Sequence, residues 1–377
     1  MEPNLELGKQ SSPLFEYDGR VGQLYGIFLS NLIFTILTLG IFRFWAITRT
    51  RRYIWSRLRF QGERFEYTGK GFELFLGLLV ACAVVIGIFL GLLIVGTVLS
   101  RLTHVKAFLW VAIALCYLVA AVLAAGAYFS AQRYRLSRTL WCGIRGGMTG
   151  SAYDYGMRKL GYGLLCAITL GQLIPWATLR LAERRINASS FGDASFHFEG
   201  RASRIYPIFL LTLVLSLALL VPLGLLEWKF MSPLIALTSH GKLPTHDLMA
   251  GAAYTHAMHG LFLVYVLFII GEILIQCFYA AALARHITGN TTLGARLQFG
   301  SRVTGTALLG LVSGNLLIVV VTLGLGYPLA LQRAMRFLAR TLTVQGSIDP
   351  SMLGQNKQDG PGTGEGMLNL FDHGGMI

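Results

Sequence analysis

The strongest constraint on this chain is a set of long segments that carry no charged residue. Residues 74–100, 107–132 and 205–226 contain no Asp, Glu, Lys or Arg, and residues 260–284 contain only Glu272. About 20 apolar residues in a helix are enough to cross the hydrocarbon core of a bilayer. These four segments therefore predict four transmembrane helices.

The composition excludes an ordinary soluble domain. Charged residues make up only 13% of the chain and the mean hydropathy is +0.59, whereas about a quarter of a soluble domain is charged. The first twenty residues hold four acidic side chains and no apolar core, so we expect no cleavable signal and insertion from an internal segment. The five cysteines form no CxxC pair, which favours reduced thiols over a disulfide framework.

Three further apolar runs, at 21–42, 160–179 and 303–332, carry an internal repeat. The first copy contains Asn31, Thr38-Leu39-Gly40, Trp45-Ala46, Arg49 and Arg52. The third copy, 284 residues later, contains Asn315, Thr322-Leu323-Gly324, Ala330, Arg333 and Arg336. The middle copy contains Thr169-Leu170-Gly171, Trp176-Ala177 and Arg180, but has Tyr162 in place of the Asn and Glu183 in place of the second Arg.

A shorter element alternates aromatic and polar residues and ends in glycine and a basic residue. It occurs at residues 15–20, 65–70 and 196–201, in each case just before an apolar segment. Alternation of this kind is typical of a half-buried strand. We therefore expect short extended pieces at the membrane surface, with the aromatics at the lipid boundary or in a shared small sheet. A set of unrelated aromatic anchors is the alternative.

The first repeat copy, followed by Phe65-Glu66-Tyr67-Thr68-Gly69-Lys70-Gly71, resembles the YjgN family of bacterial inner-membrane proteins. The residues Gly364-Glu365-Gly366 and Phe371-Asp372 also resemble the tail of that family. The resemblance extends over essentially the whole chain and is most specific in residues 15–77. It implies an integral inner-membrane protein without a characterised function, and it supplies no catalytic residues.

The charge distribution distinguishes two topologies, because Lys and Arg accumulate on the cytoplasmic side. If all seven apolar runs span, the basic residues divide with only a weak bias. If the three repeated runs enter and return on one side, only Arg101, Lys106, Lys229 and Lys242 lie outside. The repeated glycines Gly40, Gly171 and Gly324 can end a helix, and Pro175 and Pro328 suit the first turn of the next one. This favours re-entrant segments, with seven spans as the alternative.

The expected fold is an all-α integral membrane protein with four transmembrane helices, three re-entrant or transmembrane repeats and short surface strands. We divide the chain into residues 1–20 (cytoplasmic segment), 21–131 and 132–284 (two repeat units with two spans each), 285–345 (third repeat unit) and 346–377 (flexible tail). The location expected is the bacterial inner membrane, with both termini cytoplasmic.

The repeated arginines Arg49, Arg52, Arg180, Arg333 and Arg336 are candidate contacts for an anionic headgroup or ligand. Trp45 and Trp176 precede them by about one helical turn, and tryptophan favours the headgroup level. With a formal net charge of +14, we expect membrane lipids, especially anionic ones, as partners. A homo-oligomer is a further expectation. Nucleic acid is not expected, because the basic clusters adjoin apolar spans.

Three intramembrane polar residues are further candidates. Glu272 must be protonated or paired within the membrane, and it could handle ions or protons. Asn31 and Asn315 occupy equivalent places and suit hydrogen bonds between helices. A group at His240, His246, Asp247, His256 and His259 lacks a convincing metal spacing, so we expect no metal, no cofactor and no enzymatic activity.

Two functions fit these features. Repeats, broken apolar segments and an intramembrane carboxylate are shared by transporters and channel-like proteins. The alternative is a non-transporting scaffold that organises anionic lipid through its arginine-rich inner face.

Overall fold

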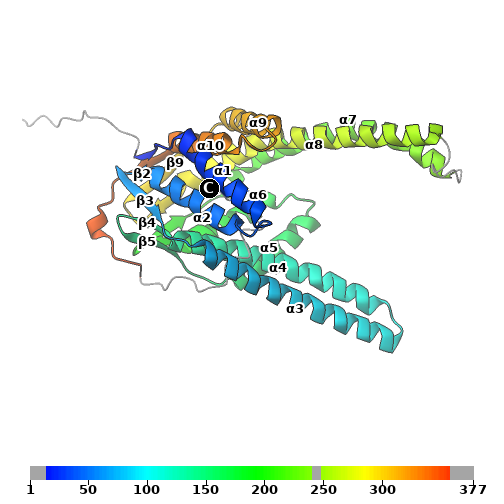
Figure 1. The fold of residues 1–377 in the computed structure, drawn as a ribbon, viewed down its shortest axis with the longest axis horizontal. Helices are drawn as coiled ribbons and strands as arrows, with labels where there is room; N and C mark the ends of the chain where they lie inside the picture. Colours follow the sequence, from blue (N-terminus) through cyan, green and yellow to red (C-terminus); the bar gives the residue numbers. More distant parts are fainter. Residues whose placement is uncertain (1–13, 240–247, 357–377) are drawn as a thin grey trace, which may run out of the picture. The chain divides into compact units, whose positions relative to one another are not determined.

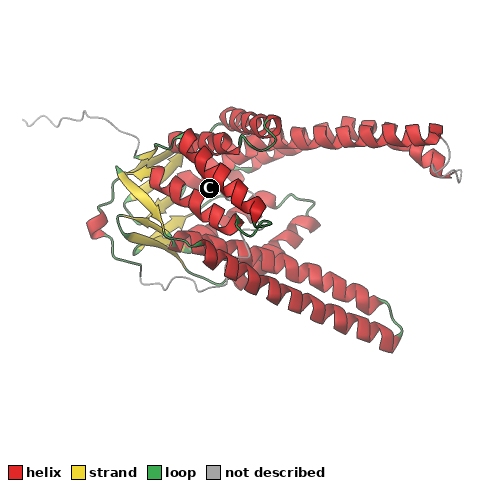
Figure 2. Ribbon diagram, in the orientation of Figure 1, coloured by secondary structure: helices red, strands yellow, loops and turns green. Residues whose placement is uncertain are grey.

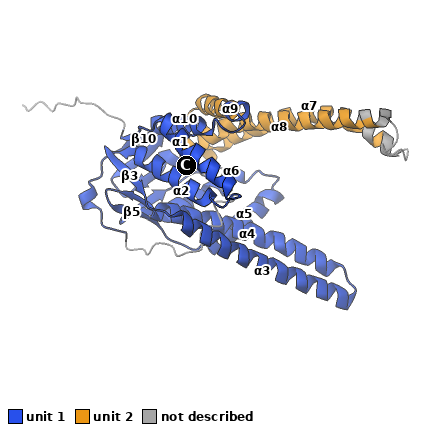
Figure 3. Cartoon of the chain, in the orientation of Figure 1, with its two compact units in different colours: residues 1–201, 287–302, 318–377 blue, residues 202–286, 303–317 orange. Residues whose placement is uncertain are grey.

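The computed structural model describes residues 14–239 and 248–356 (Figure 1). Two compact units divide the chain (Figure 3). One unit contains residues 1–201, 287–302 and 318–377, and the other contains residues 202–286 and 303–317. The first unit holds every described strand, and the second holds a long pair of helices.

A single pattern, strand–helix–helix–strand, recurs five times along the described chain. The first copy of this pattern is β1 (Phe15–Tyr17), α1 (Val21–Leu37), α2 (Arg43–Arg57) and β2 (Leu58–Phe60). The second is β3 (Glu63–Tyr67), α3 (Gly71–Thr103), α4 (Ala107–Ser137) and β4 (Thr139–Trp141). The third is β5 (Ile144–Met148), α5 (Ala152–Ile168), α6 (Ile174–Asn187) and β6 (Ser189–Phe191). The fourth and fifth are β7 (Ala194–Phe198), α7 (Tyr206–Ser239), α8 (Leu248–Gly289), β8 (Thr291–Leu293), and β9 (Leu297–Ser301), α9 (Gly305–Val321), α10 (Tyr327–Thr341), β10 (Leu342–Gln345).

The ten strands form one antiparallel sheet, so the expected all-α fold class is wrong (Figure 2). Their order in the sheet follows the sequence from β1 to β10, and the sheet curls into a nearly closed barrel. The strands at residues 15–17, 63–67 and 194–198 confirm the predicted extended pieces, and they share this sheet. The prediction failed because most strands are only three to five residues long. Strands of that length leave almost no periodic signal among long apolar helices.

The aromatic–glycine element has a steric explanation. The ring of Tyr17 lies over Gly19, and the ring of Tyr67 lies over Gly69. A Cβ atom at Gly19 would come within 2.1 Å of the Tyr17 hydroxyl, and one at Gly69 within 2.6 Å of the Tyr67 ring. Only glycine leaves room for the tyrosine at the point where the strand passes into the helix.

The second helix of a strand–helix–helix–strand repeat leads back to the sheet, and we call it the returning helix. Each returning helix of the first compact unit packs against the first strand of the following repeat. In this way α2 lies on β3, α4 on β5 and α6 on β7. The last returning helix, α10, lies on β1, where Gln332 Nε2 donates to the Gly19 carbonyl oxygen at 2.6 Å. The last repeat therefore contacts the first through α10 and β1.

The interior of the sheet is an apolar core. Phe60, Trp141 and Leu297 are buried there with residues from the other strands. Ile348 and Leu353, which follow β10, are buried in the same core. Gln355 Nε2 donates to the Gly143 carbonyl oxygen at 2.8 Å, so this segment runs across the turns of the sheet. Residues 364–372, which carry the resemblance in the tail, lie outside the described residues.

The four predicted transmembrane helices are confirmed in length and composition. They are residues 71–103 (α3), 107–137 (α4), 206–232 of α7 and 254–289 of α8. In the first compact unit, Gly96 of α3 lies against Ala112 of α4. In the second, Gly271 of α8 lies against Leu219 of α7. Small residues at such points let helix backbones approach closely within a membrane.

Candidate functional site

The Thr-Leu-Gly triplets form the tips of the three short helical hairpins, α1–α2, α5–α6 and α9–α10. In the first, Gly40 N donates to Thr35 O at 2.7 Å and Leu39 N donates to Ile36 O at 3.1 Å. This pair of hydrogen bonds is the Schellman ending of an α-helix. The glycines have φ of 93°, 84° and 89°, as the sequence predicted for Gly40, Gly171 and Gly324. The triplet therefore reverses the chain three times.

The leucine of each triplet also has a left-handed backbone, which the sequence did not reveal. Leu39, Leu170 and Leu323 have φ of 52°, 49° and 50°. This conformation costs an L-residue roughly 1–2 kcal/mol, and glycine would avoid the cost. The three side chains are 95%, 88% and 93% exposed. A strained, exposed leucine in the same place three times fits a tip immersed in hydrocarbon.

Threonine and proline complete the turns. Thr38 Oγ1 donates to Phe34 O at 2.7 Å and accepts from Phe42 N at 2.9 Å, which links the two helices. Thr322 Oγ1 makes the equivalent bonds to Ile318 O and Gly326 N. Pro175 and Pro328 lie buried in the first turn of α6 and α10, as predicted.

Both ends of each short hairpin return to the sheet, because the flanking strands pair with one another. β1 pairs with β2, β5 with β6, and β9 with β10. A helical hairpin that starts and ends at adjacent strands returns to the side of the bilayer from which it started. The strand pairing therefore favours re-entry over a single pass for the three repeated runs.

The predicted amide and arginine of the first repeat lock the two helices of its hairpin together. Asn31 is 6% exposed, and its Nδ2 donates to Ala46 O at 3.3 Å. Arg49 NH1 donates to Asn31 Oδ1 at 3.3 Å. The prediction that Asn31 bonds helix to helix is confirmed. Asn315, in α9, belongs to the second compact unit, whereas α10 belongs to the first.

The two predicted tryptophans pack within the protein. The Cα and the ring of Trp45 lie within 3 Å of the position that a Gly71 Cβ would take, so α2 and α3 touch there. Trp176 makes an edge-on contact with Tyr162 at 4.9 Å between ring centroids. Tyr162 stands where the first repeat has Asn31. An aromatic pair thus replaces the amide lock in the middle copy.

The remaining predicted arginines have different surroundings. Arg52 NH2 donates to the Gly69 carbonyl oxygen at 2.8 Å, just before α3. Arg180 pairs with Glu183 at 2.7 Å, the residue that replaces the second repeated arginine. Arg336 is exposed beside β1, where it lines a cavity with Arg302 and Arg340. No contact of Arg333 is among the described ones. The five candidates therefore do not form one site.

Basic residues do share one structural position. The last turns of α2, α4, α6 and α10 carry Arg57, Arg135, Arg184 with Arg185, and Arg340, each just before the strand that enters the sheet. Cations at a helix C-terminus are stabilised by the helix dipole. Long arginine side chains at this level of a membrane helix can also reach lipid phosphates.

Glu272 is held by its own helical hairpin. Its Oε2 accepts from Ser216 Oγ of α7 at 3.1 Å and from Gln276 Nε2 at 3.3 Å. No basic side chain is among its described contacts. A carboxylate with two neutral donors can be a packing element of the α7–α8 pair.

Two buried or half-buried polar side chains, Glu73 and Arg51, were not among the predicted site residues. They make contacts at the sheet end of the α3–α4 hairpin and of the neighbouring helix α2. Glu73 accepts from Tyr134 Oη at 2.8 Å and pairs with Arg138 at 3.0 Å. Arg51 is 3% exposed and donates to Tyr67 Oη at 3.4 Å. Glu73 follows the element Tyr67-Thr68-Gly69-Lys70, so its place in the first helical turn was the available signal.

The histidine group gives no metal site in the described part of the chain. His240, His246 and Asp247 lie outside the described residues, and the described His256 packs against Phe230 at 5.8 Å between ring centroids. No cluster of three His, Cys, Asp or Glu side chains with the geometry of a metal site occurs among residues 14–239 and 248–356.

The sequence is similar to a family of bacterial proteins and to named proteins of two bacteria. Residues 12–370 match a family described as bacterial proteins of unknown function, DUF898. A protein of Salmonella typhimurium named inner membrane protein YjgN is 24% identical over 365 residues, which cover 88% of each chain. The protein of the same name from Escherichia coli K12 is 32% identical over 65 residues, or 17% of this chain and 16% of that one. No solved structure gives a significant match.

These similarities agree with the four long apolar helices. The chain is a multi-pass protein of the bacterial inner membrane.

Proposed function

The chain belongs to the DUF898 family of bacterial proteins of unknown function, and on that premise we propose that it is a non-transporting scaffold that binds and organises anionic lipid at one leaflet. The observation that carries this proposal is the recurrence of basic residues in the last turns of α2, α4, α6 and α10, all next to one sheet. Each basic residue near an anionic surface contributes about 1 kcal/mol of attraction.

The positive-inside rule predicts which side of the membrane the sheet faces. Basic residues flank the strands, whereas the connection between α3 and α4 carries only Arg101 and Lys106. By the positive-inside rule the sheet faces the cytoplasm. The three short hairpins then enter the inner leaflet from the cytoplasmic side, with Leu39, Leu170 and Leu323 at their tips. They displace lipid near the arginines of the last helical turns.

Transport is the competing function, and the contacts of Glu272 weigh against it. The two described partners of Glu272, Ser216 and Gln276, are neutral donors on the same α7–α8 hairpin, which suits a role in packing that hairpin. The proposed scaffold needs no catalytic group and no nucleic acid. A homo-oligomer stays a prediction.

The test measures the lipid that copurifies with the full chain from membranes in mild detergent. The variant Arg57→Gln/Arg135→Gln/Arg184→Gln removes one exposed or half-exposed arginine from the last turn of each of α2, α4 and α6. We expect the ratio of phosphatidylglycerol and cardiolipin to phosphatidylethanolamine to fall by at least about fivefold, since about 1 kcal/mol is at stake per arginine.

The control removes equal charge from the sheet, away from the hairpins, as Arg59→Gln/Arg64→Gln/Arg145→Gln. We expect this variant to retain its anionic lipid. Equal loss in both variants would contradict the proposal. Saturable solute or proton flux in liposomes that Glu272→Gln abolishes would favour the transporter instead.

A further inference from the structure

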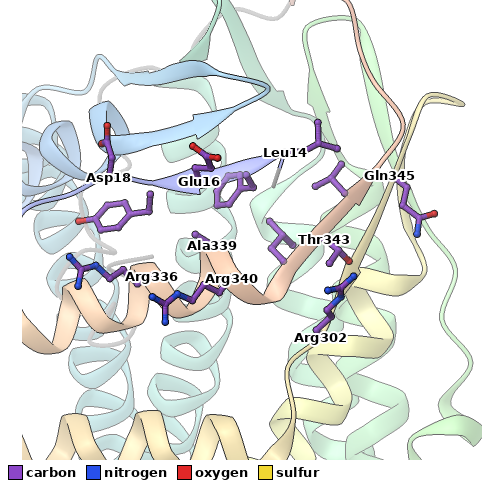
Figure 4. Close-up of a pocket in the computed structure, with 13 residues that line it drawn as sticks. Leu14, Glu16, Asp18, Arg302, Arg336, Ala339, Arg340, Thr343 and Gln345 are labelled. Carbon is purple, nitrogen blue, oxygen red and sulfur yellow. The ribbon is translucent and has the colours of Figure 1, made fainter. Parts of the chain in front are cut away.

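Within residues 14–239 and 248–356, β1 and β10 are the two end strands of the sheet; they contact each other without strand pairing, at a junction that we call the seam. All other neighbours in the sheet are paired, and four of those pairs are tight hairpins. A cavity of about 960 Å³ opens at the seam. It is bordered by β1, β10, the end of α10 and Arg302, as Figure 4 shows.

Both strands direct backbone N–H and C=O groups into the seam. Leu14 O and Asp18 N bond to β2, so the backbone groups of Phe15 and Tyr17 face away from β2. Thr341 O accepts from Arg302 N at 2.8 Å, so by the same alternation those of Leu342 and Val344 face away from β9. The seam thus offers hydrogen-bond donors and acceptors as well as space.

The rim of the seam is basic on the side of α10. Arg302, Arg336 and Arg340 line it and are exposed. Glu16 and Asp18, on β1, also line the cavity, as Figure 4 shows. Asp18 is already paired with Arg59 at 3.0 Å and Arg64 at 2.6 Å. Three guanidinium groups therefore line the cavity against Glu16 and the already paired Asp18, and guanidinium groups bind carboxylate or phosphate through paired hydrogen bonds.

The seam continues into the apolar interior of the sheet. A second cavity of about 170 Å³ lies there, lined only by apolar side chains. Phe15, Leu342 and Val344 line both this cavity and the seam. An apolar cavity of about 150 Å³ stays free of water and takes up benzene-sized molecules. A basic mouth therefore leads to a dry apolar chamber.

We propose that the seam binds an anionic amphiphile with a single alkyl chain, such as a fatty acid. The head lies at Arg302, Arg336 and Arg340, and the alkyl chain passes between β1 and β10 into the chamber lined by Phe15, Trp141 and Leu297. One chain is specified because the chamber is small. This proposal rests on the affinity for anionic lipid proposed above and assigns it a site and a ligand class.

The chamber contains its own reporter, because Trp141 is 2% exposed and lines it. The probe is 8-bromooctanoate, whose short alkyl chain suits a chamber of about 170 Å³ and whose terminal bromine quenches tryptophan at contact. The full chain is held in nanodiscs of phosphatidylcholine, and the same titration is run on Trp141→Phe. The difference between the two removes quenching of tryptophans exposed to the bilayer, such as Trp110 and Trp228.

We expect saturable quenching of Trp141. The variant Arg336→Ala/Arg340→Ala should raise the dissociation constant at least tenfold, and the uncharged 8-bromooctanol should bind correspondingly weakly. Arg180→Ala, an exposed arginine remote from the seam, should change nothing. Val344→Phe should narrow the chamber and lower the extent of quenching; an unchanged thermal midpoint verifies folding.

Absence of a Trp141 component, or equal binding of acid and alcohol, would overturn the proposal. Retained phosphatidylglycerol with no Trp141 quenching would reject the seam site alone. Saturable quenching with no enrichment of anionic lipid would reject the scaffold role and keep the seam. Head and chamber variants that both leave the titration unchanged would show that the bromooctanoate binds elsewhere and would overturn the proposal.

Discussion

The hairpins α1–α2 and α5–α6 have the same repeat, nearly the same lengths and the same tip, but different chemistry holds their helices together. In the first, Asn31 bonds to Ala46 and Arg49. In the second, Tyr162 and Trp176 make a ring contact at 4.9 Å, and Arg180 turns to Glu183 instead. The tip and the flanking strands were retained while the contact between the helices changed. The re-entrant turn is therefore the common requirement, and the lock is replaceable.

The tips should respond alike in the two hairpins and show the largest effect. Leu39→Asp or Leu170→Asp places a carboxylate where we expect hydrocarbon, at a cost of about 2.5–3.5 kcal/mol. The measurement is the thermal midpoint in nanodiscs, which should fall markedly for both variants.

Met352→Asp is the matched control, because Met352 is 65% exposed on the segment that follows the sheet. It should leave the midpoint unchanged if that face meets water. Tips that tolerate Asp as well as Met352 does would mean that the three turns are not immersed.

The hairpin tips were easier to predict from the sequence than the sheet. Thr38-Leu39-Gly40 and its copies are contiguous, so identity at a fixed offset exposed them. The left-handed conformation of the leucines is invisible, because a left-handed residue is expected to be Gly or Asn. The four spans are legible from composition alone.

The sheet was hidden for a different reason. Strand β4 reads Thr139-Leu140-Trp141 and β6 reads Ser189-Ser190-Phe191, too short for a periodic signal. Only the aromatic–glycine element was legible, and it marked three of the ten strands. The repeats α3–α4 and α7–α8 also escaped notice, since their helices are about twice as long and lack the Thr-Leu-Gly turn. The seam depends on contacts between residues more than 280 positions apart, which no local pattern encodes.

The tryptophans should separate the two hairpins next. Truncating a packed Trp to Ala costs about 3–5 kcal/mol in a full core, and both residues here are half-buried, so we expect about 2 kcal/mol for Trp176→Ala. Trp45→Ala should cost more, because Trp45 also fills the contact with Gly71 and Phe75.

The measurement is thermal unfolding of both variants in the same detergent. Trp45→Phe and Trp176→Phe are the controls and should recover most of the loss. A larger effect at Trp176 would contradict the contact between α2 and α3.

The amide lock should be worth about 1 kcal/mol, since hydrogen bonds between membrane helices average about 0.6 and reach about 1.7 kcal/mol. Asn31→Ala should lower the free energy of unfolding by that amount. A double-mutant cycle with Arg49→Ala should show coupling, because Arg49 donates to Asn31 Oδ1. The same cycle on Tyr162 and Arg180 should show none, and coupling there would erase the difference between the hairpins.

The smallest effect should come from Arg180→Ala. Its ion pair with Glu183 spans 2.7 Å, but the arginine side chain is 52% exposed and the pair lies on one helix. Exposed pairs of this kind contribute about 0.3–0.5 kcal/mol, and salt screens them. We therefore expect a loss within that range at low salt that disappears near 1 M salt. Unfolding in detergent at both ionic strengths measures it. A loss above about 1 kcal/mol that persists in salt would mean that Arg180 serves the middle hairpin as Arg49 serves the first, and the two hairpins would then be locked alike.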